Sequence, residues 1–150
     1  MSDLIIRPIR AEDYEAWDPL FHGYCDFYEV ESTKDSRRIT FDWLLDPAEI
    51  LEGLVVERDG ALIGLAHYRE MPRPSRAQKM GFLDDLFVDP ATRGGRVGEK
   101  IFDALREICR QRGWQMMRWL TQDHNYAART LYDRVGQKSL FNLYEMTVDG

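Results

Sequence analysis

The chain lacks several features that would mark it for common classes of function. It has two cysteines, Cys25 and Cys109, without the spacing of a metal site, and so few thiols favour the reduced state of the cytoplasm. No apolar run approaches the length of a membrane span. The net charge of -6 at pH 7 argues against nucleic acid, whose binding needs clustered lysine and arginine. The sequence therefore predicts a cytoplasmic protein that binds neither nucleic acid nor a membrane.

Internal repeats, low-complexity tracts and long linkers rich in glycine and serine are also missing. The chain of 150 residues, of which 44% are hydrophobic, can bury a substantial core unaided. At its N-terminus an acid and a base flank a very short apolar pair, which fits neither a signal peptide nor a lipidation site. We expect one domain over residues 1–150.

What is present is a succession of strand-like and helix-like apolar patterns. Apolar residues spaced three and four apart indicate helices, and short apolar runs bounded by turn residues indicate strands. The Asp59-Gly60 pair is a strong hairpin signal. We expect strands over residues 4–9, 54–56, 61–68, 80–88, 116–120 and 139–148, a loop over 71–76, and helices over 11–28, 36–45, 95–112 and 125–135. Strands with interspersed helices predict an α/β or α+β sheet domain.

The loop over residues 93–98, Arg-Gly-Gly-Arg-Val-Gly, connects the strand that ends at Val88 to the following helix. The unpaired amides and positive dipole end of a helix bind anions, glycines let a phosphate approach the backbone, and two arginines add charge. The plain alternative is a flexible turn before a helix. The loop has neither the P-loop pattern nor the full glycine spacing of a dinucleotide fold, so it fits neither class of nucleotide site.

The run Leu-Asp-Asp-Leu-Phe-Val-Asp-Pro over residues 83–90, followed by this loop, resembles the acetyl-CoA-binding motif of the GNAT superfamily of N-acetyltransferases. A second run, Asn125, Ala128 and then Leu-Tyr-Asp-Arg-Val-Gly over 131–136, is similar to the family's distal helix, whose tyrosine lies beside the CoA sulfur. The resemblance implies a GNAT-type α/β (α+β) single domain with a mixed central sheet of about six to seven strands flanked by about four helices.

Arg96 departs from the family pattern, because it occupies the position that is usually the middle glycine. If that position requires a positive φ or a very close phosphate, the geometry of CoA binding must differ. Arg96 still supplies a backbone amide, which proline would have removed, and its side chain could contact a CoA phosphate.

The resemblance implies acetyl-CoA as cosubstrate and no metal. The end of the strand would offer backbone groups to the pantetheine amides, and the loop would hold the pyrophosphate. An amide near Phe87 or Val88 would steady the tetrahedral oxyanion. The cofactor-binding residues expected in this way are Leu86, Phe87, Val88, Arg93, Gly94, Gly95, Arg96, Val97, Gly98 and Asn125.

Acetyl transfer to an amine requires the neutral amine, and deprotonating an alkylamine of pKa 10.4 at pH 7 costs about 4.6 kcal/mol. Asp84 and Asp85 are adjacent on a strand, so we expect their side chains to point to opposite faces. By comparison with amine-acetylating members of the family, Asp84 would bind the acceptor or take its proton through water. The alternative is a solvated acid beside a hydrogen-bonded structural acid.

Tyr132 has an ordinary pKa near 10, keeps its proton at neutral pH and can donate it to the departing CoA thiolate. The resemblance assigns it that role, whereas without the family it would be read as a core or boundary tyrosine. Asn125 has a plain interpretation as the N-cap of the last helix. The family places an asparagine here near the pantetheine arm.

The aromatic residues of the first helix are typical of a core, but in this family the loop after that helix commonly borders the acceptor. Candidate acceptor-binding residues are therefore Tyr24, Tyr28, Glu29, Glu31 and Asp85. The histidines His22, His67 and His124 share no metal-like spacing, and no cysteine has the pattern of a nucleophile. We assign no chemistry to them.

The sequence thus predicts an acetyl-CoA-dependent N-acetyltransferase that acts on a primary amine by direct attack in a ternary complex. The resemblance favours small amines or polyamines as acceptors. Two alternatives stay open, a protein or peptide amine as acceptor and a CoA-binding sensor domain without turnover. Members of the family often pair as dimers, so a homodimer is one expectation to test.

Overall fold

The computed structural model describes residues 3–92 and 96–149. The chain divides into two units, Met1–Leu120 and Thr121–Gly150, and each is described by itself. The first unit contains β1 (Leu4–Pro8), α1 (Tyr14–Phe27), α2 (Lys34–Leu45), β2 (Glu52–Arg58), β3 (Ala61–Arg73), β4 (Gln78–Val88), α3 (Val97–Arg112) and β5 (Met117–Trp119). The second unit contains α4 (Tyr126–Val135). Short 3-10 turns cover Ala11–Asp13, Pro74–Arg76 and Pro90–Thr92.

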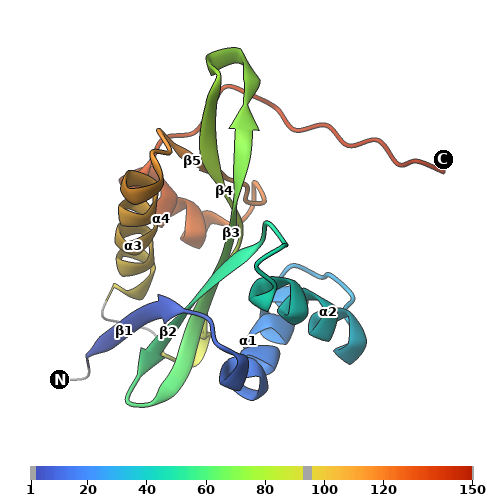
Figure 1. Ribbon diagram of the computed structural model, residues 1–150, viewed down its shortest axis with the longest axis vertical. Helices are drawn as coiled ribbons and strands as arrows, with labels where there is room; N and C mark the ends of the chain where they lie inside the picture. The colour runs from blue at the N-terminus through green and yellow to red at the C-terminus, as the bar shows by residue number, and fades with distance from the viewer. Residues whose placement is uncertain (1–2, 93–95, 150) are drawn as a thin grey trace. The chain divides into compact units, whose positions relative to one another are not determined.

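A mixed sheet forms the centre of the first unit (Figure 1). Its strand order is β1-β2-β3-β4-β5, in which the first three pairings are antiparallel and β5 is parallel to β4. Asp59 and Gly60, with φ of 54° and 81°, form the tight turn between β2 and β3, as their sequence predicts. The α/β class is confirmed. The expectation of six to seven strands is wrong, since the described residues form a five-stranded sheet.

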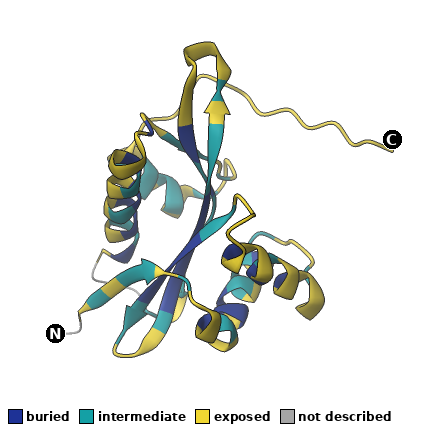
Figure 2. Cartoon of the chain, viewed as in Figure 1, coloured by how far each residue is buried: buried dark blue, intermediate teal, exposed yellow. Residues whose placement is uncertain are grey.

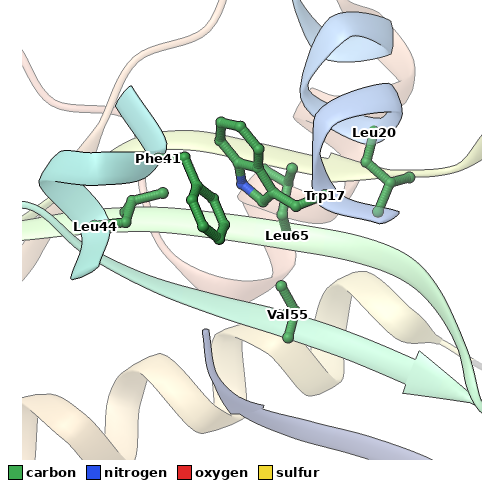
Figure 3. Close-up of a cluster of buried hydrophobic side chains, with 6 residues drawn as sticks. All are labelled: Trp17, Leu20, Phe41, Leu44, Val55 and Leu65. Carbon is green, nitrogen blue, oxygen red and sulfur yellow. The ribbon is translucent and has the colours of Figure 1, made fainter. Parts of the chain in front are cut away.

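Both faces of the central strands are buried. Val55 and Val56 are adjacent in β2, so their side chains point to opposite faces, yet both are almost fully buried. Figure 1 shows α1 and α2 on one side of these strands and α3 on the other. On the first face, Trp17, Leu20, Phe41, Leu44, Val55 and Leu65 form a core cluster (Figure 3). A sheet covered on both faces is open to a ligand chiefly at its strand ends and edges.

A buried ion pair, which the sequence did not predict, joins α1 to α2. Arg37 Nε donates to Asp18 Oδ1 at 2.7 Å, and both residues are only 6% exposed. Burial opposes ionisation of Asp18, but Arg37 and Lys34 hold the pKa of its carboxyl below the usual range. Leaving either charge unpaired here would be costly. The pair therefore fixes the two helices together, and with them Tyr24 near the end of α1.

A β-bulge interrupts the pairing of β3 with β4. Asp85 lies opposite His67, but the next pair along the ladder is Tyr68 with Leu83, so Asp84 is an extra residue in β4. An extra residue of this kind bends the strand and breaks the regular alternation of its side chains. The bulge therefore decides which side chains of β4 share a face.

Two expectations about strands differ from the structure. Residues 71–73, expected in a loop, continue β3 because the antiparallel ladder runs on to the pair Arg73 and Gln78. The closing strand expected over residues 139–148 does not form. In the described part of the second unit α4 is the only regular element, so this segment has no strand partner there. Figure 2 shows this segment coloured as exposed. Its apolar side chains include Leu140, which is 99% exposed, and Met146, which is 90% exposed.

Candidate active site

One edge of β4 is open toward the end of the strand. Residues 86–88 pair with residues 64–66 of β3 on one edge. On the other edge, β5 pairs with β4 only from Gly81 to Leu83. Within the part of the chain that the structure describes, the backbone of residues 84–88 therefore has no strand on that second edge. An edge of this kind can pair with an extended ligand.

The helix after β4 begins with a left-handed residue. The predicted loop residues Arg93, Gly94 and Gly95 lie outside the described residues. Arg96, the N-cap of α3, has φ of 53° and ψ of 44°. The position that is usually glycine therefore does have a positive φ, which a residue with a side chain adopts at a cost of roughly 1–2 kcal/mol. Val97 opens the first turn, where helix amides lack partners within the helix and can face an anion.

The two adjacent aspartates are on the same face of the sheet, contrary to the expectation from sequence. Asp85 Oδ2 lies 2.8 Å from His67 Nδ1, and Asp84 Oδ2 accepts a hydrogen bond from Arg69 Nε at 2.9 Å. His67 and Arg69 are two residues apart in β3, so their side chains share a face. The two side chains do not alternate between faces because the bulge places Asp84 out of register. Both carboxyl groups are thus on the face that α1 covers.

The two carboxyl groups differ in their surroundings. Burial raises the pKa of the Asp84 carboxyl, although the hydrogen bond and charge of Arg69 oppose this effect, and the negative charge of Asp85 adds to it. The Arg69 guanidinium also lies 4.7 Å from the centroid of the Phe82 ring, which holds it in place beside Asp84. A carboxyl group with a raised pKa is a better proton acceptor at neutral pH than an ordinary aspartate.

Aromatic residues from the end of α1 lie beside these aspartates. The Tyr24 hydroxyl donates to the backbone carbonyl of Asp84 at 3.4 Å. Burial raises the pKa of this hydroxyl, and the charge of Asp85 and a hydrogen bond with it raise the pKa further, so Tyr24 keeps its proton. The Tyr24 ring lies 4.8 Å from the Tyr28 ring and 6.3 Å from the Phe87 ring, centroid to centroid. The structure therefore brings Tyr24 to the two aspartates, and the Tyr28 ring packs against the Tyr24 ring.

The remaining predicted site residues lie after α1 and in the second unit. Glu29 and Glu31 are exposed in the segment after α1. In the second unit, Asn125 Oδ1 accepts a hydrogen bond from the Ala128 amide at 3.4 Å, which confirms the predicted N-cap of α4. Tyr132 is half-buried within α4.

Sequence reasoning missed His67, which is 0% exposed in the middle of β3. Its Nε2 lies 3.0 Å from Trp17 Nε1, and its Nδ1 contacts Asp85. The available signal was a polar residue within the apolar run 61–68, because a buried polar side chain needs a partner on another element. The identity of that partner could not be read from spacing.

The sequence predicts neither a metal site nor a membrane span. In residues 3–92 and 96–149, no group of three or more His, Cys, Asp or Glu side chains is arranged to hold a metal ion. No helix in the same ranges combines the length and apolar character of a membrane span. Cys25 and Cys109 are both buried free thiols.

The fold is that of the N-acetyltransferases. The aminoglycoside N-acetyltransferase AAC(6')-Iy, solved in complex with CoA, superimposes with a TM-score of 0.85. The two sequences are 18% identical, and the match covers 100% of this chain and 97% of that chain. An identity this low shows a shared fold alone.

The sequence then gives the family. The model of the acetyltransferase (GNAT) family matches residues 17–137, so the chain belongs to that family, and it is an N-acetyltransferase whose acetyl donor is acetyl-CoA. It is 26% identical over 144 residues to the D-amino-acid N-acetyltransferase HPA3 of Saccharomyces cerevisiae, covering 95% of this chain and 89% of the relative. It is 28% identical over 131 residues to the uncharacterized N-acetyltransferase YhfO of Bacillus subtilis, covering 87% of each.

Proposed function

We propose that this N-acetyltransferase transfers the acetyl group of acetyl-CoA to the primary amine of a small molecule, a simple amine or polyamine, by direct attack in a ternary complex. The observation that carries the proposal is the pair Asp84 and Asp85, which share one face of the sheet beside Tyr24. Carboxylates and aromatic rings suit an ammonium group through charge and cation–π attraction. The names of relatives that act on D-amino acids and aminoglycosides support a small acceptor.

The open edge of β4 suits the pantetheine arm of the cosubstrate. Backbone groups of residues 86–88 can pair with the pantetheine amides as a further strand would, and one amide near Phe87 or Val88 can stabilise the oxyanion. The amides of residues 93–98, with the charges of Arg93 and Arg96, suit the pyrophosphate. Asn125 would contact the pantetheine arm in addition to capping α4.

Asp84 is the proposed proton acceptor. An ammonium group of pKa 10.4 yields the neutral amine at pH 7 at a cost of about 4.6 kcal/mol, so a nearby base assists the reaction. The raised pKa of Asp84 makes it a stronger base than an ordinary aspartate. Asp85, on the same face, would help to hold the ammonium group.

Tyr132 is the proposed acid. Asp84 first takes one proton from the ammonium group, directly or through water, and releases it to solvent. As the C–N bond forms and the C–S bond breaks, the nitrogen loses its second proton to Asp84. Tyr132 donates its hydroxyl proton to the thiolate of CoA and regains a proton from solvent. No residue carries the acyl group, because the amine attacks the thioester itself.

Release of CoA with a panel of amines tests the acceptor class. The panel contains diamines, polyamines, D-amino acids, an aminoglycoside and short peptides with free amino groups. We expect small amines to be consumed faster than peptides. The opposite ranking would make a protein or peptide amine the acceptor, and acetyl-CoA binding without turnover of any amine would favour the sensor alternative.

Tyr132→Phe tests the proposed acid. We expect kcat to fall about 100-fold, because a general acid contributes that much or more, and the affinity for acetyl-CoA to stay unchanged in calorimetric titration. Tyr126→Phe is the matched control, since Tyr126 is in the same helix and is 72% exposed. Full turnover in Tyr132→Phe would remove Tyr132 from the acid role.

We also propose that the protein is a homodimer in the cytoplasm. The segment 139–148 exposes large apolar side chains, with Tyr144 at 88% and Val148 at 93%, and exposed apolar groups gathered in one segment suit a protein interface. The buried free thiols Cys25 and Cys109 suit a reducing compartment. Light scattering of the full chain should give twice the mass of one chain, and the mass of a single chain would refute the dimer.

A further inference from the structure

A chain of hydrogen bonds runs from the core of the first unit to the candidate amine site. Trp17 belongs to the core cluster (Figure 3), and both Trp17 and His67 are 0% exposed. The indole Nε1 lies 3.0 Å from His67 Nε2, and His67 Nδ1 lies 2.8 Å from Asp85 Oδ2. The Asp85 side chain is 20% exposed, so a substrate can reach it.

Trp17 determines where His67 carries its proton. An indole nitrogen can only donate, so His67 Nε2 must accept and carries no hydrogen. The hydrogen of the neutral ring is then on Nδ1, which donates to Asp85 Oδ2. His67 therefore orients Asp85 as a neutral donor and leaves the negative charge of the carboxylate in place.

Asp84 has a different partner. The Arg69 guanidinium donates to it at 2.9 Å, so a full positive charge offsets that carboxylate. Asp85 thus contacts a neutral ring, whereas Asp84 contacts a cation. An ammonium group is attracted more strongly to a carboxylate that is hydrogen-bonded to a neutral ring than to one that is paired with a guanidinium.

We infer that Trp17 and His67 are positioning residues that hold Asp85 as the carboxylate to which the acceptor's ammonium group binds. The inference rests on the proposed acetylation of an amine and adds a division of roles, in which Asp85 binds the cation and Asp84 takes its proton. The Tyr24 hydroxyl donates to the backbone carbonyl of Asp84 and so holds the same stretch of β4 through a neutral group. If Trp17 and His67 only packed the core, removing their hydrogen bonds while keeping their volume would leave the KM for the amine unchanged.

Two variants of His67 separate positioning from packing. His67→Asn keeps an amide N–H near the place of Nδ1, whereas His67→Leu keeps apolar volume and removes every donor. In the full chain, His67→Leu should raise the KM for the amine about tenfold or more and leave the KM for acetyl-CoA unchanged, because a hydrogen bond to a charged group is lost. His67→Asn should recover much of that loss. Equal amine KM values in the wild type and both variants would overturn the positioning role.

Nitrogen-15 NMR of the histidine rings tests the proton position independently of activity. The wild type should show His67 as the neutral ring with its hydrogen on Nδ1, assigned by the signals that disappear in His67→Asn. Trp17→Phe keeps an aromatic ring and removes the indole N–H, so it should lose this preference and raise the KM for the amine. A hydrogen on Nε2 in the wild type, or a doubly protonated ring, would overturn the inference.

The outcomes distinguish this inference from the proposed function. If the wild type acetylates no amine, the proposed function and the ammonium role of Asp85 both fail. If an amine is acetylated but Asp85→Asn leaves its KM unchanged, the inference fails alone. If circular dichroism shows His67→Leu to be unfolded, the KM of Trp17→Phe for the amine is compared with that of the wild type instead, and equal values overturn the inference.

Discussion

Arg96 is a residue whose backbone conformation costs free energy at a candidate binding site. It is the N-cap of α3, with a φ of 53° that glycine adopts without a steric penalty. Its Nη1 lies 3.7 Å from Glu99 Oε2, at the exposed start of the helix. Strain of this kind is concentrated at ligand-binding sites, where the surrounding structure maintains it.

We predict that Arg96→Gly has a free energy of unfolding about 1 kcal/mol higher than Arg96→Ala, because alanine keeps the left-handed strain and glycine removes it. Both variants lose the guanidinium, so both should lose the same part of the affinity for acetyl-CoA. Urea unfolding gives the first comparison and calorimetric titration gives the second. A glycine variant less stable than the alanine variant would show that this position is not strained in solution.

At this scale the sequence predicted some features and missed others for identifiable reasons. Asn125 was recognised as an N-cap because capping depends only on residues within one turn. The shared face of Asp84 and Asp85 was missed because it depends on the register of β4 against β3. His67 was missed because its partners, Trp17 and Asp85, are distant in the chain.

At the scale of the element, one edge of β4 is paired with β5 over a short stretch and is open beyond it. Gly81 lies in the paired stretch. A Cβ on Gly81 would lie 2.6 Å from Met117 Cε and 2.9 Å from the Trp114 ring. The Met117 methyl is the end of a flexible chain and can move. The Trp114 ring is held, because its Nε1 donates to Glu70 at 2.8 Å. The absence of a side chain at Gly81 therefore lets β5 and the segment that follows α3 pack against β4.

We predict that Gly81→Ala lowers the free energy of unfolding by about 1–3 kcal/mol, the usual cost of adding volume to a packed site. The midpoint of urea unfolding measures this change. Gln78→Ala is the control, since Gln78 is exposed in the same strand and should leave the midpoint nearly unchanged. Equal midpoints for the two variants would mean that the ring moves aside at little cost.

The sequence predicted the elements that depend on neighbouring residues and missed those that depend on residues far apart in the chain. The Asp59-Gly60 hairpin was predicted because two residues set that turn. The extension of β3 to Arg73 was not, because it depends on the ladder with Gln78. The strand expected over 139–148 was wrong because an apolar segment forms a strand only where another strand supplies hydrogen bonds.

At the scale of the whole molecule, Asp13 ties the start of the chain to the sheet. Arg7 of β1 donates two hydrogen bonds of 2.8 Å to it, and the same guanidinium lies 3.5 Å from Glu57 of β2. The hydrogen bonds from Arg7, opposed by burial and aided by the backbone amide of Arg10, lower the pKa of the Asp13 carboxyl. The ion pair therefore links folding of the first unit to pH.

We predict that the wild type loses stability in acid more steeply than Asp13→Asn. A carboxyl group whose pKa is lowered by folding stabilises the protein above its unfolded pKa of about 3.9, and this contribution is lost as the pH falls through the lower folded value. Urea unfolding between about pH 5 and about pH 2 measures the two profiles. Asp3→Asn, at an exposed position, should follow the wild type. Parallel profiles for wild type and Asp13→Asn would contradict the prediction.

The class of the whole molecule could be predicted from sequence, but the arrangement of the proposed acceptor site could not. The family follows from short patterns within residues 83–136, and the match over residues 17–137 confirms it. The proposed acceptor region lies where α1 meets β4, and the hydrogen bond there between Tyr24 and Asp84 joins residues 60 positions apart. No local pattern specifies such a meeting, because packing of the core brings these elements together.

The two buried thiols can report local opening of the helices in the first unit. Cys25 is in α1 and Cys109 is in α3, so each side of the sheet has one buried cysteine in a helix that covers it. A thiol-modifying reagent reaches each sulfur only when its own helix lifts away. The labelling rate of each cysteine therefore measures local opening of its own helix. A ligand that stabilises only one of the two helices would slow the labelling of that cysteine and leave the other rate unchanged.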